Sequence, residues 1–277
     1  MDSIVKPKLA ALALVLSVIL QIPANLRAGG QDLHAQSAAA LLERDFDDPD
    51  LSYVLLDGDG QIVAQRWDGP EAEIPVGSLM KPFLAVAYGR THESFPVLRC
   101  TGKKTCWLPR GHGTLRVSEA IALSCNSYFQ QLIAQGGRHF RPALENLHLR
   151  PSSDSDGEAS LTMASPLLLA RAYLELTRRS REPAVSQILQ GMAISAQRGT
   201  AKAMAAELHG VSALAKTGTS PCTHRKKAPG DGLALVMTPA DHPRSLLLVR
   251  VHGRPGFMAA SIAGRMMARV ESNGSSR

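Results

Sequence analysis

The pattern of apolar and polar residues places strands near both ends of the chain and helices between them. Two β-rich runs, Leu51–Leu56 and Gln61–Gln65, flank the turn sequence Asp57-Gly58-Asp59-Gly60, and this arrangement predicts a hairpin. Three further strand-like runs come late in the chain, at Ser212–Lys216, Leu233–Thr238 and Leu246–Val251. The pattern therefore predicts two early strands and three late ones.

Helical periodicity dominates the middle of the chain. An Ala- and Leu-rich segment, Gln31–Arg44, precedes the first strand, and Met258–Val270 follows the last. Ser165-Pro166 begins an internal helix with an N-cap residue and a proline at the first helical position. The internal helices are expected at Pro82–Tyr88, Ser118–Leu123, Tyr128–Ala134, Ser165–Thr177 and Val185–Ala196.

The order of these elements predicts the fold class. It is neither a tandem repeat nor a strand–helix alternation, which disfavours a doubly wound nucleotide-binding fold. We expect an α+β protein with a five-stranded antiparallel sheet built from both chain ends and a helical lobe inserted between them. Terminal helices would cover one face of the sheet, and the cleft between sheet and lobe is the expected place for a site.

Residues 1–28 have the composition of an export signal. Lys6 and Lys8 precede the apolar run Leu9–Pro23, and small residues follow at Ala24 and Ala28. The run has about 15 residues, fewer than the roughly 20 of a membrane-spanning helix. A cleaved signal peptide, an uncleaved N-terminal anchor and a buried core helix are the three interpretations. The first two place the rest of the chain outside the cytoplasm, in the periplasm or another extracytoplasmic compartment.

The remaining chain is expected to form one domain at residues 51–270, after a lead-in helix at 29–50 and before a flexible polar tail at 271–277. Hydrophobic residues make up 44% and charged residues 20%, as in ordinary globular proteins. The net charge is +7, but aromatic residues are only 4%, too few for a platform that stacks nucleic-acid bases. We therefore expect no nucleic-acid partner.

The four cysteines suit an exported protein without making it rich in disulfides. Cys100 and Cys106 flank a short Thr-Gly-Lys-Lys-Thr loop, so a local disulfide is plausible, while the pairing of Cys125 and Cys222 stays open. Zinc is the competing interpretation, but the spacing is not C-x-x-C and no second pair follows. The nine histidines show no H-E-x-x-H or other ligand spacing. We therefore expect no metal site and no cofactor.

The first chemical motif is Ser78-Leu79-Met80-Lys81, at the start of a predicted helix. Residues i and i+3 share a helix face, so the hydroxyl and the amine can meet. Pro82 fits only a first helical turn, which places Ser78 at the helix N-terminus. Serine is a weak nucleophile until a base takes its proton, and a lysine whose pKa is lowered by burial can be that base. Alone the motif is weak, because Ser3-Ile4-Val5-Lys6 matches it too.

The second motif, Ser124-Cys125-Asn126, lies between two predicted helices. A hydroxyl and an amide two residues apart on a turn can point into one cavity. Helix capping by Ser124 or Asn126 is the structural alternative.

The third motif, Lys216-Thr217-Gly218-Thr219, ends a predicted strand. A cation, two hydroxyls and a glycine that lets a ligand approach the backbone together suit a carboxylate. The alternative is a solvated strand end.

Taken together and in this order, S-x-x-K, S-x-N and K-T-G are the motif set of serine penicillin-recognising enzymes. The chain resembles the transpeptidase domain of penicillin-binding proteins, particularly class B, over roughly Leu51–Val270. Val76–Phe83 is similar to that family's entry into the serine helix. Gly111–Gly113 and Ala120–Phe129 resemble its approach to the second motif, and Asp231–Pro239 resembles the strand after K-T-G.

The resemblance implies catalytic roles for three residues. Ser78 would attack the D-Ala-D-Ala carbonyl of a peptidoglycan stem peptide and form an acyl-enzyme. Lys81 would be the general base, and Ser124 would relay a proton toward the leaving group. The backbone amides of Ser78 and Thr219 would form the oxyanion hole, and β-lactams would acylate the same serine.

The resemblance also implies the substrate-binding residues. Asn126 would hold the substrate amide, while Lys216, Thr217, Gly218 and Thr219 would bind the terminal carboxylate. The implied partners are peptidoglycan stem peptides, β-lactams as covalent inhibitors, and a cell-wall or membrane protein.

Individual residues distinguish β-lactamases and other serine hydrolases from penicillin-binding transpeptidases. A class A β-lactamase needs a carboxylate for its deacylating water, and Glu145, the superficial candidate, lacks the E-x-x-L-N spacing. Class D enzymes usually have Val in place of Asn126. No G-x-S-x-G elbow supports a lipase-like hydrolase. We therefore expect a slowly deacylating D,D-transpeptidase or carboxypeptidase, and a non-catalytic β-lactam-sensing or cell-wall scaffold domain is the alternative.

Overall fold

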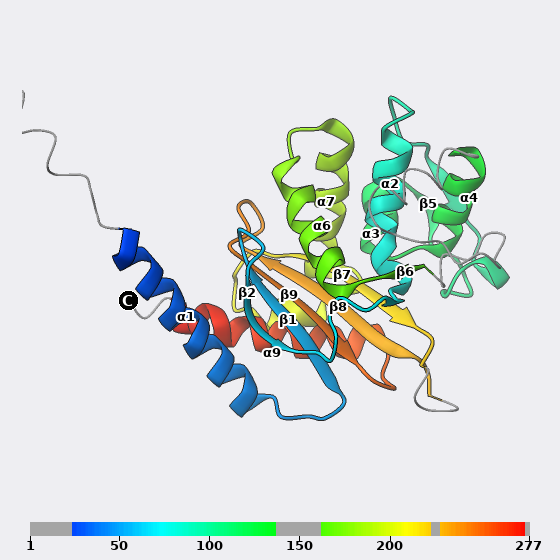
Figure 1. Ribbon diagram of the computed structural model, residues 1–277. Helices are drawn as coiled ribbons and strands as arrows, with labels where there is room; N and C mark the ends of the chain where they lie inside the picture. The colour runs from blue at the N-terminus through cyan, green and yellow to red at the C-terminus, as the bar shows by residue number, and fades with distance from the viewer. Residues whose placement is uncertain (1–23, 137–161, 223–227, 275–277) are drawn as a thin grey trace, which may run out of the picture.

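The computed structural model describes residues 24–136, 162–222 and 228–274. Its centre is a five-stranded antiparallel sheet in the order β2-β1-β9-β8-β7 (Figure 1). The strands are β1 (Leu51–Asp57), β2 (Ile62–Arg66), β7 (Leu214–Ser220), β8 (Asp231–Thr238) and β9 (Ser245–Val251). The predicted α+β class and the sheet built from both chain ends are confirmed.

The two halves of the sheet meet where β1 pairs with β9, from Leu51 opposite Val251 to Asp57 opposite Ser245. The β1–β2 hairpin turns at the predicted site. There Asp57 Oδ1 accepts hydrogen bonds from the amides of Asp59 (3.0 Å) and Gln61 (2.8 Å). At the opposite end of the sheet, β7 is the outermost strand.

Helices cover both faces of the sheet (Figure 1). One face packs against α1 (Ala24–Asp45), α8 (Ala203–Glu207) and α9 (Gly256–Gly274). The other face carries the helical lobe, which consists of α2 (Lys81–Gly89), α3 (Val117–Ala122), α4 (Asn126–Gly136), α6 (Pro166–Arg178) and α7 (Pro183–Arg198).

Short elements complete the lobe. The 3₁₀ turn η1 (Gly77–Met80) leads directly into α2, and η2 (Lys103–Thr105) lies in the loop before α3. Two small antiparallel pairs are formed by β3 (Ile74–Pro75) with β6 (Met163–Ala164), and by β4 (Leu98–Cys100) with β5 (Gly113–Leu115).

Alternate residues of the central strands fill two hydrophobic cores. In β8, Leu233 and Leu235 face the helical lobe, whereas Ala234 and Val236 pack with the terminal helices. All eight residues of β8 are buried. A strand covered on both faces therefore has a nearly continuous apolar sequence, which is why this strand was predictable.

Several helices begin or end at residues other than those predicted from the sequence. The lead-in helix expected at 29–50 is α1, which begins at Ala24 and ends at Asp45. Ser165 caps α6 as predicted, because its Oγ accepts a hydrogen bond from the Leu168 amide (3.2 Å). The last helix, α9, continues to Gly274, into the segment expected to be a flexible tail.

Two predictions concern residues outside the described ranges. The apolar run Leu9–Pro23, interpreted as a signal or an anchor, is one, and Glu145 is the other. Among the residues described, no helix combines the length and the apolar character that crossing a bilayer requires.

A buried ion pair joins β8 to the end of β9. Arg250 donates to Oδ2 of Asp231 through Nε (2.9 Å) and Nη2, and the Gly253 amide donates to Oδ1 (2.9 Å). His252 Nδ1 lies 3.2 Å from the same Oδ2. Burial favours the neutral acid, but hydrogen bonds from Gly253, Cys222 and Arg250 hold the pKa of Asp231 below its ordinary value.

Replacing Asp231 with alanine should lower the free energy of unfolding by about 3–5 kcal/mol, because it leaves the buried Arg250 guanidinium without its counter-charge. Urea denaturation at neutral pH measures the loss. The control is Glu175→Ala, which removes an exposed ion pair to Arg178 (3.2 Å) and should cost less than about 1 kcal/mol. Equal, small losses in the two variants would contradict this interpretation of the Asp231–Arg250 pair.

Candidate active site

The first motif lies at the junction of η1 and α2. Ser78 is in the 3₁₀ turn that precedes α2, so Pro82 indicated its place correctly. The serine is half-buried and lines a cavity of about 590 Å³. Lys81 is the first residue of α2 and is buried beneath the cavity.

Gly77 brings the serine turn into contact with β7. Its φ is +50°, and a Cβ at this position would lie 2.3 Å from the Thr219 carbonyl oxygen and 3.4 Å from the Thr219 nitrogen. Both the positive φ and the close approach require glycine. The backbone of the Ser78 turn is therefore held directly against the strand that carries the third motif.

The Lys81 ammonium points at the second motif. Nζ donates to the Ser124 carbonyl oxygen (2.8 Å), to Oδ1 of Asn126 (2.5 Å) and to Oγ of Ser124 (3.3 Å). Burial lowers the pKa of Lys81 to about 7, against the opposing charge effect of Cys125 and Cys106. A large share of this amine is therefore neutral near pH 7, as a proton acceptor must be.

Lys216 reaches the same hydroxyl from β7. Its side chain is fully buried, and Nζ donates to Ser124 Oγ (3.0 Å) and to the Thr217 carbonyl oxygen (2.7 Å). Burial, and then the charge of Lys81, lower the pKa of Lys216 well below its ordinary value. The Ser124 hydroxyl consequently lies between two amines that belong to the first and third motifs.

The second motif is a strained turn between α3 and α4. Ser124 has φ +49°, an uncommon conformation for a residue other than glycine. The side chains of Ser124 and Asn126 make their hydrogen bonds to lysines. These bonds favour a role in the site over the alternative of helix capping.

The third motif lies inside a strand and not at its end. We expected the strand to stop at Lys216, but β7 continues to Ser220 because Thr217–Ser220 pair with Asp231–Ala234. Thr217 Oγ1 donates to Thr200 Oγ1 (2.7 Å), and Thr219 Oγ1 accepts from the Gly256 amide (3.2 Å). The motif thus lies on an outer strand, next to Ser78.

One cavity brings the three motifs together. Its lining includes Ser78, Ser124, Asn126, Thr217, Gly218 and Thr219, and the two buried lysines lie behind Ser124. Sequence patterns did not identify the rest of the lining, because single residues at helix ends and in loops match no motif. These residues include Arg198, Lys202, Trp107 and Phe257.

The added lining residues make the cavity basic and partly apolar. Arg198 and Lys202 line it, and no Asp or Glu does so within the described part of the chain. Trp107 and Phe257 are 54% and 64% exposed and add apolar surface at the rim. A basic cavity with no carboxylate among its described lining residues favours an anionic ligand with an apolar body.

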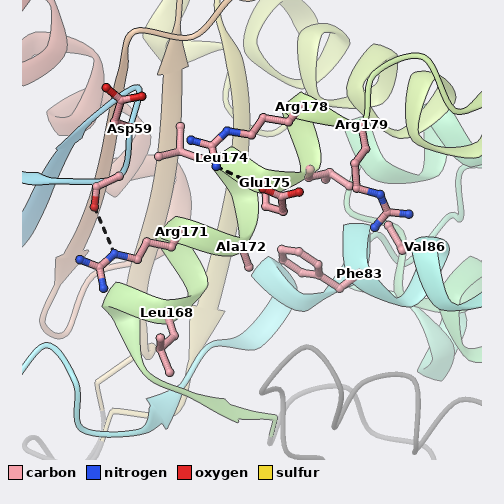
Figure 2. A pocket seen from close by; sticks show the side chains of 12 residues that line it. Asp59, Phe83, Val86, Leu168, Arg171, Ala172, Leu174, Glu175, Arg178 and Arg179 are labelled. Carbon is pink, nitrogen blue, oxygen red and sulfur yellow. Dashed lines mark hydrogen bonds and ion pairs between the residues drawn. The ribbon is translucent and has the colours of Figure 1, made fainter.

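A second cavity of about 380 Å³ lies between the β1–β2 turn, α2 and α6 (Figure 2). Arg171 donates to the Gly60 carbonyl oxygen (3.1 Å) and Arg178 pairs with Glu175 (3.2 Å) at its wall. None of the described lining residues is a Ser, Cys or His. This cavity lies where the lobe docks on the hairpin, and its described lining carries no hydroxyl or thiol nucleophile.

The suggested Cys100–Cys106 disulfide is absent, and all four cysteines are free thiols. Cys100 and Cys106 instead direct their sulfurs at Nδ1 of His112, at 3.6 and 3.4 Å. Cys125, from the second motif, lies 3.8 Å from the Cys106 sulfur. Three thiols, from β4, from the loop after η2 and from the turn between α3 and α4, therefore surround the imidazole of His112. The sequence spacing did not indicate this convergence.

No protein-family model matches the sequence, and no curated protein matches it. Solved structures match the fold. Penicillin-binding protein PBP2 of Pseudomonas aeruginosa, in complex with WCK 5153, has a TM-score of 0.69 at 16% identity, covering 85% of this chain and 74% of that one.

Two more solved structures have a similar fold. The transpeptidase domain of the FtsI4 D,D-transpeptidase from Legionella pneumophila has a TM-score of 0.63 at 19% identity, covering 87% of this chain and 96% of that one. PBP2 of Helicobacter pylori, in complex with MreC, has a TM-score of 0.69 at 13% identity, with coverages of 87% and 63%. The chain has the fold of penicillin-binding protein transpeptidase domains, as its motifs indicated.

Proposed function

We propose that the chain is a penicillin-binding serine acyltransferase. It acts on the D-Ala-D-Ala end of peptidoglycan stem peptides, as a D,D-transpeptidase or D,D-carboxypeptidase. The proposal rests on one observation: Lys81 of the first motif and Lys216 of the third both donate to the Ser124 hydroxyl of the second, beside the cavity lined by Ser78.

In the acylation step, Ser78 Oγ attacks the carbonyl carbon between the two D-alanines. Neutral Lys81 accepts the hydroxyl proton. As the C–N bond breaks, Ser124 gives its proton to the nitrogen of the departing D-alanine and takes the proton held by Lys81, so that both side chains return to their starting states. The Ser78 and Thr219 amides stabilise the oxyanion, and such a donor is worth about 3–4 kcal/mol. The contact of Gly77 with Thr219 supports this pairing of amides.

Two features support recognition of the substrate: the positive charge of the cavity and the outer edge of β7. The terminal carboxylate binds at Lys216, Thr217 and Thr219, with Arg198 and Lys202 adding positive potential. Asn126 holds the peptide amide. Because β7 is the outermost strand of the sheet, an extended stem peptide can align along it by backbone hydrogen bonds.

Persistence of the penicillin adduct tests this proposal. No described residue lining the cavity is a carboxylate that would activate a water, so the acyl-enzyme should hydrolyse slowly. Intact-mass spectrometry after addition of penicillin should show one adduct per chain that persists after unbound drug is removed. Rapid turnover of penicillin without a lasting adduct would contradict the proposal.

Release of D-alanine from a pentapeptide then separates catalysis from binding. A carboxypeptidase releases D-alanine with water as acceptor, and a transpeptidase also joins the acyl group to an added amine. Acylation by penicillin without either product would instead favour the sensing or scaffold function.

We also propose that the protein is exported, with residues 1–28 as signal peptide or with Leu9–Pro23 as an anchor. Its substrate lies outside the cytoplasm, which supports export. The complex of Helicobacter pylori PBP2 with MreC supports a cell-wall protein as a partner of this chain.

A further inference from the structure

We propose that Cys100, Cys106, His112 and Cys125 bind one zinc ion in a tetrahedral site next to the second motif. Their ligand atoms, three sulfurs and an imidazole nitrogen, all lie within 4.8 Å of one another. This group is separate from the Ser78, Lys81 and Ser124 side chains to which the proposed reaction is assigned.

The distances match a tetrahedron around zinc. With Zn–S bonds of about 2.3 Å and Zn–N bonds of about 2.0–2.1 Å, tetrahedral angles put two sulfurs about 3.8 Å apart and a sulfur and a nitrogen about 3.5–3.6 Å apart. The two sulfurs of Cys106 and Cys125 are 3.8 Å apart. Nδ1 of His112 lies 3.4 Å from the Cys106 sulfur and 3.6 Å from the Cys100 sulfur. These three distances match the tetrahedron, and the remaining pairs of ligand atoms lie within 4.8 Å of each other.

The local fold explains how the ligands meet. Cys100 ends β4 and pairs with Gly113 of β5, which brings His112 beside it. Cys106 follows η2, and Cys125 comes from the turn between α3 and α4. All three cysteines are buried, and the Trp107 ring packs edge-on against the imidazole with 5.2 Å between the ring centroids. Burial in an apolar shell protects thiolate ligands from solvent.

A metal accounts for this convergence better than a disulfide does. A disulfide joins two sulfurs at about 2.05 Å and would leave the third cysteine and the histidine unused. A zinc ion uses all four donors. Three thiolates and an imidazole suit zinc, whereas calcium and magnesium require oxygen ligands, and the group contains none.

The proposed zinc site is a structural site and not a catalytic one. Four protein ligands complete the coordination of zinc, so no position remains for water or substrate. Cys125 lies between Ser124, whose φ is +49°, and Asn126, which bonds Lys81. A zinc ion at Cys125 would thus hold the strained turn of the second motif against the loop that begins at Cys100.

Metal content of the purified full-length chain tests the proposal directly and does not depend on any activity. Protein produced with zinc in the medium should contain about one zinc per chain. Cys106→Ser should lose the zinc, while the matched control Cys222→Ser should retain it, because Cys222 lies outside the group. Removal of zinc from the wild-type protein by a chelator should lower its midpoint of thermal unfolding.

Cobalt substitution keeps the test valid if Cys106→Ser fails to fold. One Co²⁺ added to zinc-free wild-type protein should give the visible spectrum of tetrahedral cobalt with thiolate ligands, and one Zn²⁺ should abolish it. The proposal is overturned if the wild-type protein takes up neither metal, if Cys106→Ser retains its zinc, or if mass spectrometry finds a disulfide among Cys100, Cys106 and Cys125. Failure of penicillin to bind would leave these outcomes unchanged.

Discussion

Replacing Ser78 with alanine should abolish covalent labelling by a fluorescent penicillin. The variant removes the oxygen that forms the acyl bond, and no other serine has a buried amine with a lowered pKa at the i+3 position within the described residues. Loss of the nucleophile removes the acylation pathway instead of slowing it. We therefore expect no labelled band on a denaturing gel at penicillin concentrations that label the wild-type protein fully.

The fold should survive this substitution. Ser78 is half-buried at the wall of a cavity, so loss of one oxygen should change the free energy of unfolding by no more than about 0.5 kcal/mol. The matched control is Ser186→Ala, an exposed serine on α7, which should label like the wild-type protein. Labelling that persists in a folded Ser78→Ala variant would exclude Ser78 as the nucleophile.

Replacing Lys81 with methionine should reduce the rate of acylation by penicillin by about 10³–10⁴-fold. General-base catalysis by a positioned side chain contributes about 10²–10⁴-fold. Lys81 also donates to Asn126 and to both oxygens of Ser124, so the loss should fall in the upper part of that range. Methionine has a length similar to that of the apolar stem of lysine and lacks the amine.

The pH profile identifies the role of Lys81 more specifically than the rate does. In the wild-type protein the acylation rate should rise with pH through about 7, because the neutral, proton-accepting amine of Lys81 is populated above its pKa. Lys81→Met should lose this dependence. Lys202→Met, at the cavity wall, should keep it. A Lys81→Met variant with the wild-type pH profile would assign the base to another group.

The sheet was predictable because its strands have simple patterns. The Asp57–Gly60 turn and the apolar runs of β8 and β9 report local conformation and burial directly. The extension of β7 to Ser220 was missed because Thr217-Gly218-Thr219 resembles a polar strand end. These residues are part of the strand because they pair with β8, which is distant in sequence. Pairing between strands is a tertiary effect that overrides local propensity.

The site was predictable in its motifs and not in its surroundings. Ser78, Lys81 and Lys216 could be named as candidates because each belongs to a short motif with a chemical reason for its spacing. Arg198 reaches the cavity from the end of α7 and matches no motif. The thiol cluster was missed because Cys125 is distant in sequence from Cys100 and Cys106 and meets them only through the tertiary fold.

The pairing of β1 with β9 also has a consequence for how the chain folds. Leu51 and Val251 are paired, so the centre of the sheet joins residues from opposite ends of the domain. Contacts of such high sequence separation slow folding, because a long loop must close before they form. During synthesis the β1–β2 hairpin leaves the ribosome long before its partner strand. We expect the nascent chain to expose this hairpin until β9 emerges, and a chain truncated before β9 to aggregate.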